Sequence, residues 1–237
     1  MAVGRPVIVL IPAFNEEDTL ADVLAGVRAA QPEAELVVVD DGSSDRTAAV
    51  ASAGGAAVLR HPFNLGYGAA LQTGYKYALA RGADELLQMD GDGQHEAGEI
   101  EGILAPLRAG EADLVIGSRF LAETGYAMGH TRDLGRRIFG LLGRIAGVEI
   151  SDPTSGFQAL NRRTLELYTE SFFPHDYPDV DVLVTAARRG IRIRETPVRM
   201  LESPRASTLH GGTRAIYYVY KMLLSLWAAS GSTKERS

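Results

Sequence analysis

Short apolar runs alternate with segments of helical spacing along the first half of the chain. Residues 7–11 are continuously apolar and rich in β-branched side chains, and Pro12 ends the run, which predicts a buried strand of a parallel sheet. The same patterns predict further strands at residues 36–39, 56–59 and 85–89, and helices at residues 16–30, 46–53 and 66–80. Strands that alternate with helices in this way indicate β-α-β units.

Polar residues stand where two of these helices are expected to begin. Asn15 is predicted to cap the helix at residues 16–30, because its side chain can accept a hydrogen bond from the first helical turn. Ser43, Ser44 and Asp45 can do the same for the helix at residues 46–53.

The second half continues with strands and helices, without an internal repeat or a linker. Strands are predicted at residues 113–117 and 191–198, and helices at residues 131–147, 161–169, 180–189 and 213–229. Gly190 is expected to close the helix at residues 180–189. The sequence therefore predicts a single α/β domain with a central, mostly parallel sheet flanked by helices.

Polar clusters follow three of the predicted strands. They occupy residues 12–17, 40–45 and 90–95. Because ligands of open α/β sheets bind beyond the carboxyl ends of the strands, these clusters are expected to converge on one site. Their convergence is a stronger signal than any one cluster.

The third cluster has the residue types of a metal site. Asp90 and Asp92 stand one residue apart at a strand end, so both can turn towards one hard cation. Mg²⁺ and Mn²⁺ favour one or two carboxylates together with the phosphates of a ligand. Gly91 lets the backbone approach a ligand closely, and Gln94 adds a neutral oxygen. Two neighbouring aspartates are by themselves weak evidence for a metal site, since acidic turns are common.

Composition narrows the classes of protein and of site. The 237 residues are 46% hydrophobic and 23% charged, as in an ordinary globular protein. The absence of cysteine excludes disulfides, thiolate metal sites and a cysteine nucleophile, and it fits a reducing compartment. The five histidines lack the spacing of zinc ligands.

Charge is distributed unevenly along the chain. Residues 1–118 carry seven basic and 18 acidic residues, whereas residues 188–237 carry ten and three. The acidic part could hold a cation and the basic end could meet phosphate or an anionic surface, although two solvated faces of opposite sign would give the same pattern. The acidic half has no basic stripe with interleaved aromatic residues, so nucleic-acid binding is not expected.

Two predicted helices bear on contact with a membrane. No stretch reaches 18 consecutive apolar residues, and the N-terminus lacks the features of a signal peptide, so we expect a cytoplasmic protein. Residues 131–147 combine an apolar stripe with an Arg-rich side, which suits either a peripheral membrane helix or a helix packed on the core. Residues 213–229 hold Tyr, Trp and Lys221 among apolar residues, which suits a membrane boundary, a membrane-protein partner, docking on the domain or a homodimer.

Six motifs occur in a consistent order. They are residues 9–17 (VLIPAFNEE), 37–45 (VVVDDGSSD), 64–68 (NLGYG), 89–95 (MDGDGQH), 116–119 (IGSR) and 151–157 (SDPTSGF). With them the chain resembles the inverting family-2 glycosyltransferases of the GT-A fold, in particular the dolichol-phosphate mannosyltransferase-like branch that acts on polyprenyl phosphates. The resemblance covers about residues 5–210 and implies a nucleotide-sugar-binding half at 1–95 and an acceptor half at 96–210. The residue pattern adds a C-terminal amphipathic helix and tail at 211–237.

The resemblance also implies roles for individual residues. Those expected to contact the nucleotide sugar are Pro12, Phe14, Glu16, Val39, Asp40, Asp41, Asp90 and Gly91. Asp90, Asp92 and Gln94 are expected to hold Mg²⁺ or Mn²⁺ and, through the metal, the diphosphate. These roles agree with chemistry, because a divalent cation neutralises the charge of a leaving diphosphate and a carboxylate suits ribose hydroxyls.

On the acceptor side, the resemblance places Arg119 at the phosphate of a polyprenyl phosphate, and arginine suits phosphate oxygens. Arg136 and Arg137 fall near another phosphate-contacting position of the family. The sequence departs from the branch after residue 198, where Ser203 and Leu209 stand near the places of an Arg and a Lys. Arg205 is the candidate substitute.

The acceptor decides whether a general base is needed. A polyprenyl phosphate is already anionic and can attack the anomeric carbon directly, opposite the nucleotide diphosphate, which inverts that centre. An alcohol acceptor would need a base, and Asp181 is the candidate because it aligns with an acidic family position. Asp92, Arg119 and Asp181 are thus the expected catalytic residues.

Other classes of protein remain as alternatives. A sugar-phosphate nucleotidyltransferase would need a Gly-rich, basic loop after the first strand, and residues 12–17 are acidic and lack Gly. A non-catalytic nucleotide-sugar-binding protein would keep the same donor site. The sequence leaves the nucleotide base, the sugar and the oligomeric state open.

Overall fold

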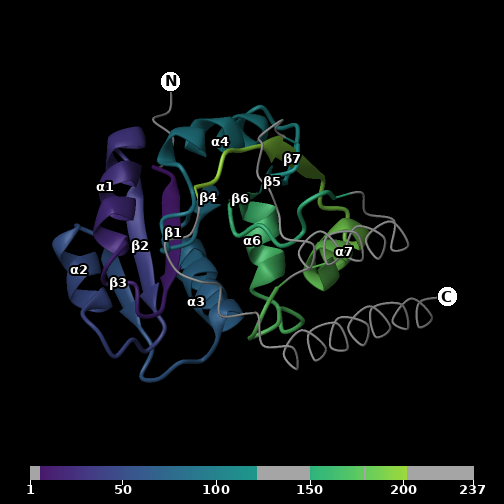
Figure 1. Ribbon diagram of the computed structural model, residues 1–237. Helices are drawn as coiled ribbons and strands as arrows, with labels where there is room; N and C mark the ends of the chain where they lie inside the picture. The colour runs from purple at the N-terminus through teal and green to yellow at the C-terminus, as the bar shows by residue number, and fades with distance from the viewer. Residues whose placement is uncertain (1–5, 122–149, 179, 202–237) are drawn as a thin grey trace, which may run out of the picture.

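One seven-stranded sheet forms the centre of the molecule in the computed structural model, which describes residues 6–121, 150–178 and 180–201 (Figure 1). The strand order is β3-β2-β1-β4-β6-β5-β7. The strands are β1 (Ile8–Ala13), β2 (Glu35–Asp40), β3 (Ala57–Arg60), β4 (Glu85–Gln88), β5 (Leu114–Ser118), β6 (Gln158–Asn161) and β7 (Ile193–Pro197). The predicted single α/β domain with a mostly parallel sheet is confirmed.

Helices cover both faces of this sheet (Figure 1). They are α1 (Leu20–Ala30), α2 (Thr47–Ala53), α3 (Tyr67–Ala80), α4 (Ile100–Arg108), α6 (Arg162–Tyr168) and α7 (Val180–Arg188), with a short 3₁₀ helix at Ala97–Glu99. Val9 and Ile11 of β1 pack with α1 and α4, whereas Ile8 and Leu10 pack with α3, α6 and α7. This alternation follows from the two-residue period of a strand, so β1 is buried on both faces.

Among the described residues beyond residue 95, the sequence patterns missed one α-helix and one strand, in addition to the short 3₁₀ helix. The first is α4, whose buried residues Ile100, Ile103, Leu104 and Leu107 recur at helical spacing. The second is β6, which runs antiparallel between β4 and β5. Strand β6 is only four residues long and is bounded by Gln158 and Asn161. Its pattern of apolar residues is therefore too short to be distinguished from that of the helix that follows it.

The predicted cap at Asn15 is wrong. Helix α1 begins at Leu20, and Thr19 holds the capping position. Asn15 instead adopts a left-handed conformation with φ of 57°, and its side-chain oxygen accepts a hydrogen bond of 2.9 Å from Ser44 N. The polar side chain is thus used to join the loop after β1 to the loop after β2.

Parallel pairing places the predicted polar clusters at one edge. Ala13 pairs with Asp40, and Leu10 pairs with Gln88. Because β1, β2 and β4 are parallel, the loops that follow them leave the sheet at the same edge. The convergence expected from the sequence is therefore present.

No helix within the described ranges is long and apolar enough to cross a bilayer. The predicted helices at 131–147 and 213–229 lie outside the described residues, as do Arg136, Arg137 and Arg205.

A buried carboxylate joins β5, β6 and β7 at the opposite edge. Asp113 accepts hydrogen bonds from Arg192 Nε at 3.0 Å, Arg192 Nη2 at 2.9 Å and Asn161 Nδ2 at 2.8 Å. The Arg192 hydrogen bonds hold the pKa of Asp113 well below its usual range, against the opposing effect of burial. A lowered folded-state pKa stabilises the protein above the unfolded pKa, and this stabilisation is lost as the pH falls.

We expect Asp113→Asn to lower the free energy of unfolding by about 1–3 kcal/mol at pH 7, since hydrogen bonds to a charged group are lost. The difference from wild type should shrink at pH 3, below the unfolded pKa of about 3.9. Urea unfolding at both pH values measures this difference in the free energy of unfolding, and the exposed Asp22→Asn substitution is the control. Equal stability of Asp113→Asn and wild type at pH 7 would contradict this expectation.

Candidate active site

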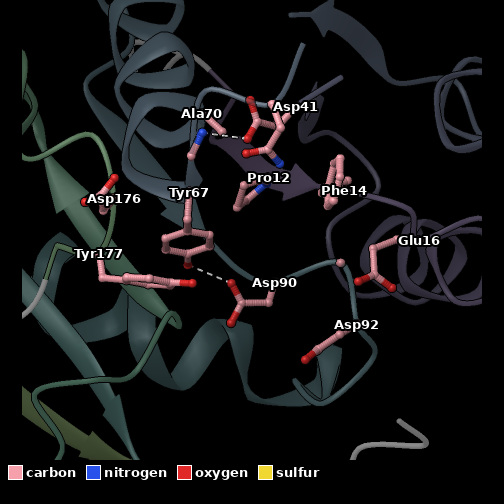
Figure 2. A pocket seen from close by; sticks show the side chains of 14 residues that line it. Pro12, Phe14, Glu16, Asp41, Tyr67, Ala70, Asp90, Asp92, Asp176 and Tyr177 are labelled. Atoms are coloured by element: carbon pink, nitrogen blue, oxygen red, sulfur yellow. Dashed lines mark hydrogen bonds between the residues drawn. The ribbon is translucent and has the colours of Figure 1, made fainter. Parts of the chain in front are cut away.

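A cavity of about 470 Å³ opens at the edge where the three polar loops meet (Figure 2). Its volume is in the range of small-molecule sites. It is lined by Pro12, Ala13, Phe14, Glu16, Asp41, Asn64, Gly66, Tyr67, Ala70, Asp90, Gly91, Asp92, Asp176 and Tyr177. Seven of the residues predicted to bind the donor or metal are thus brought together, namely Pro12, Phe14, Glu16, Asp41, Asp90, Gly91 and Asp92.

The loop after β1 forms one wall. Phe14 exposes 46% of its surface, so an aromatic face is available to a ligand. Glu16 lies in the same loop, and its backbone N–H donates to Thr47 Oγ1 at 2.8 Å. The Thr19 hydroxyl lies 3.0 Å from Glu16 Oε2 and 2.8 Å from the Gly91 carbonyl oxygen, which links this wall to the loop after β4.

Asp41 supports the opposite wall. Its carboxylate accepts hydrogen bonds of 2.9 Å from the backbone N–H groups of Leu65 and Gly66, and it lies 2.7 Å from His61 Nδ1. His61 in turn lies 2.9 Å from Thr73 Oγ1 on α3. Asp41 therefore holds the loop before α3 in place, a role that the sequence did not reveal.

Two glycines allow a distant segment to reach the cavity. A Cβ atom at Gly66 would meet the carbonyl oxygen of His175 at 2.6 Å, and one at Gly68 would collide with that of Pro174. The backbone N–H of Gly68 donates to Asp176 O at 2.6 Å. This close crossing brings Asp176 and Tyr177 to the cavity. The sequence patterns missed both residues, and the spacing of the two glycines was the available signal.

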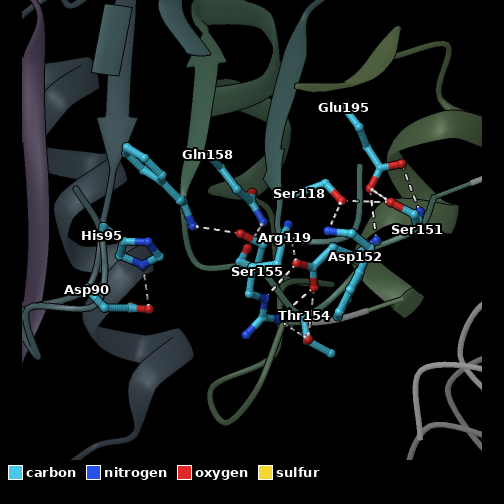
Figure 3. A network of polar contacts seen from close by, with 12 residues as sticks. Asp90, His95, Ser118, Arg119, Ser151, Asp152, Thr154, Ser155, Gln158 and Glu195 are labelled. Carbon is cyan, nitrogen blue, oxygen red and sulfur yellow. Dashed lines mark hydrogen bonds and ion pairs between the residues drawn. The ribbon is translucent and has the colours of Figure 1, made fainter. Parts of the chain in front are cut away.

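Asp90 is held at both carboxylate oxygens. Tyr67 Oη donates to Oδ1 at 2.7 Å, and His95 Nε2 lies 3.1 Å from Oδ2 (Figures 2 and 3). Burial raises the pKa of Asp90, but the His95 and Tyr67 hydrogen bonds and the charge of Arg119 outweigh it and lower the pKa overall. Burial and the Asp90 charge keep the pKa of Tyr67 well above its usual value, so its hydroxyl remains a donor.

Asp92 is oriented by Gln94. The backbone N–H of Gln94 donates to Asp92 Oδ1 at 3.0 Å, and its side-chain Nε2 donates to Oδ2 at 2.6 Å. Gln94 therefore presents its amide nitrogen to Asp92, whereas the sequence predicted that its oxygen would bind a metal. Burial and the neighbouring charge of Asp90 raise the pKa of Asp92.

These carboxylates fit a divalent cation that also binds a ligand. Among the described residues, no group of three or more His, Cys, Asp or Glu side chains could hold a metal. Two carboxylates suffice for Mg²⁺ or Mn²⁺ when phosphate oxygens and water complete the coordination. A cation between Asp90 and Asp92 would also offset the repulsion that raises the pKa of Asp92.

Arg119 belongs to a polar network beside the cavity (Figure 3). Its Nε and Nη2 atoms each donate to the fully buried Asp152 at 2.7 Å, and Nη2 also donates to Thr154 Oγ1 at 3.2 Å. Glu195 accepts hydrogen bonds of 2.8 Å from the backbone N–H groups of Ser151 and Asp152. Arg119 is thus held in a fixed place, close enough for its charge to lower the pKa of Asp90.

Besides Gln94 and Arg119, three further predicted site residues of the described chain do not line the cavity. Val39 lies in the core, and fully buried Asp40 accepts a hydrogen bond of 2.9 Å from Ser43 N and lies 3.1 Å from Arg60 Nε. Asp181 stands in the first turn of α7, and burial together with the charge of Asp181 raises the pKa of Tyr168. The structure places these three side chains outside the cavity wall.

Gly156 packs directly against Asp90. A Cβ atom at Gly156 would collide with Asp90 Oδ2 and would lie 2.9 Å from its Cγ. We expect Gly156→Ala to displace Asp90 and to lower the free energy of unfolding by about 1–3 kcal/mol, as overpacking does. Urea unfolding measures this change.

Gly102→Ala is the matched control for Gly156→Ala. Gly102 lies in helix α4, and no atom lies within 4 Å of the place that a Cβ atom would occupy, so the added methyl should stabilise the helix by up to about 1 kcal/mol. The assigned packing of Gly156 would be refuted if the two variants had the same stability.

Comparison with known proteins identifies the family. A family model described as glycosyl transferase family 2 matches residues 8–168. The undecaprenyl-phosphate mannosyltransferase of Micrococcus luteus is 32% identical over 83% of this chain and 84% of its own length. The polyprenol monophosphomannose synthase of Mycolicibacterium smegmatis is 32% identical over 82% and 77%.

Solved structures show the same fold. Glucosyl-3-phosphoglycerate synthase from Mycobacterium tuberculosis, in complex with phosphoglyceric acid, has a TM-score of 0.72 at 24% identity, over 94% of this chain and 80% of that one. The same enzyme has been crystallised with Mn²⁺ and UDP-glucose, with a TM-score of 0.69. The chain belongs to glycosyl transferase family 2 and is a glycosyltransferase with the GT-A fold.

Proposed function

We propose that the protein transfers a hexose, with inversion, from a nucleotide sugar to a polyprenyl phosphate in a reaction that depends on Mg²⁺ or Mn²⁺. One observation carries this proposal: Asp90 and Asp92 open onto the same cavity as Phe14, Glu16 and Asp41. A nucleotide with its base near Phe14 and its ribose near Glu16 would extend its diphosphate towards the two aspartates.

The chain's own residues would bind and orient the donor. A bound divalent cation supplies positive charge to the leaving diphosphate. Asp90 and Asp92 would hold that cation, with Tyr67 and Gln94 orienting them through the hydrogen bonds described above. Phe14 offers an aromatic face to the base.

A phosphate acceptor agrees with the position of Asp181. This residue is the candidate base for an alcohol acceptor, and it does not line the cavity; Arg119, the candidate for a phosphate acceptor, lies beside the cavity and does not line it either. An anionic phosphate needs positive charge instead of a base, and the guanidinium of Arg119, which is paired with Asp152, acts at Asp90 through its charge. Two relatives that share 32% identity over most of their length are named for transfer to polyprenyl phosphates. Action on such a lipid would place the protein at the cytoplasmic face of a membrane.

The proposal is tested with purified protein, Mn²⁺, a short polyprenyl phosphate and radiolabelled GDP-mannose or UDP-glucose in separate reactions. Label should enter the organic phase from one donor and identify the sugar. Asp92→Asn should reduce the rate about 10²–10³-fold, because charge stabilisation of the leaving group is lost. Exposed Asp22→Asn on α1 should leave the rate unchanged.

Two results would count against the proposal. Full activity of wild type in EDTA, or of Asp92→Asn in Mn²⁺, would show that the reaction does not depend on the proposed metal site. Donor hydrolysis without transfer to the lipid phosphate would show that a polyprenyl phosphate is not the acceptor.

A further inference from the structure

A chain of buried side-chain hydrogen bonds ends at Asp90. Tyr75 Oη donates to Gln88 Oε1, and Gln88 Nε2 donates to Tyr67 Oη at 3.4 Å. Tyr67 Oη then donates to Asp90 Oδ1 at 2.7 Å. This series of hydrogen bonds runs from Tyr75, buried in the core, to the Asp90 carboxylate at the cavity, and Figure 2 shows its last step, from Tyr67 to Asp90.

Gln88 is held in place within this series of hydrogen bonds. It is the last residue of β4, only 2% exposed, and paired with Leu10 on one side and Gln158 on the other. Because Tyr75 donates to its oxygen, its amide nitrogen faces Tyr67 and the Gly156 carbonyl oxygen, which lies at 3.0 Å. The orientation of the amide is therefore determined by its partners.

Tyr67 has little freedom to move. It stands in the first turn of α3, between Gly66 and Gly68, which pack under the backbone of residues 174–176. Its hydroxyl accepts from Gln88 and donates to Asp90, so both of its hydrogen-bonding directions are used. With His95 near Oδ2, the Asp90 carboxylate is held at both oxygens, and each oxygen keeps a further lone pair.

We propose that Tyr67, held by Gln88, is a positioning residue that orients Asp90 for the divalent cation and thereby sets the affinity for that cation. The inference rests on the proposed metal-dependent function. Without the Tyr67 hydroxyl, Asp90 Oδ1 loses a donor and the carboxylate can rotate away from the cavity. Residues that orient metal ligands in this way typically contribute about 10–100-fold to metal affinity or activity.

The same helix provides a matched control. Tyr77 lies ten residues further along α3 and donates from its hydroxyl to Glu35 Oε1 at 2.9 Å. Glu35 is the first residue of β2, at the edge of the sheet away from the cavity. Tyr77→Phe therefore removes a tyrosine-to-carboxylate hydrogen bond of the same type from the same helix without touching the site.

The experiment measures the affinity for Mn²⁺ by electron paramagnetic resonance, with the full chain and with UDP or GDP in separate titrations. Tyr67→Phe is expected to raise the Kd for Mn²⁺ about 10–100-fold. Tyr77→Phe should stay within about twofold of wild type, since it lies far from the ligands. Thermal unfolding of each variant in EDTA reports folding independently of the metal.

Failure of the inference and failure of the proposed function give different results. If wild type binds Mn²⁺ and Asp92→Asn does not, an unchanged Kd in Tyr67→Phe overturns the inference alone, as does equal weakening in Tyr77→Phe. If wild type binds no Mn²⁺ with either nucleotide, the result contradicts the metal site of the proposed function and the role of Tyr67 together.

A second variant covers the case in which Tyr67→Phe does not fold. Gln88→Met keeps a similar side-chain volume but removes the amide that donates to Tyr67 and Gly156. It is expected to weaken Mn²⁺ binding in the same direction. A folded Gln88→Met variant with wild-type Mn²⁺ affinity would overturn the inference.

Discussion

The parallel pairing of β1 with β2 and β4 is the constraint on which the site depends. Ala13 pairs with Asp40 and Leu10 with Gln88, so the chain leaves all three strands at one edge. The strands are buried under helices on both faces, which holds these exits in a fixed relation. The cavity is thus built by loops on a rigid base, an arrangement that suits a site for precise chemistry.

Negative charge near the cavity must be compensated before a ligand arrives. Asp41 is compensated by backbone N–H groups, Asp90 by Tyr67 and His95, and Asp152 by the guanidinium of Arg119. Burying a carboxylate without such partners is costly. The same hydrogen bonds that permit burial also set the direction of each carboxylate, so the polar groups around the cavity are organised by the fold itself.

Arg119 and Asp90 are joined through one loop. Residues 151–157 orient Arg119 through Asp152, and the same loop packs Gly156 against Asp90. Gln88 binds the Gly156 carbonyl oxygen and, through Tyr67, reaches Asp90 as well. A displacement of this loop would therefore affect the positions of Arg119 and of Asp90 together.

The sequence by itself determined the α/β class, the parallel strands and the three converging acidic clusters, because apolar periodicity and strand-end residues are local signals. It left β6 and α4 unrecognised and misplaced the role of Asn15. Only the tertiary structure decided that Asp40 is buried, that Asp181 stands outside the cavity wall, and that Tyr177 lines it. These outcomes depend on contacts between residues far apart in the chain, such as the crossing of residues 174–176 over Gly66, and no local pattern encodes them.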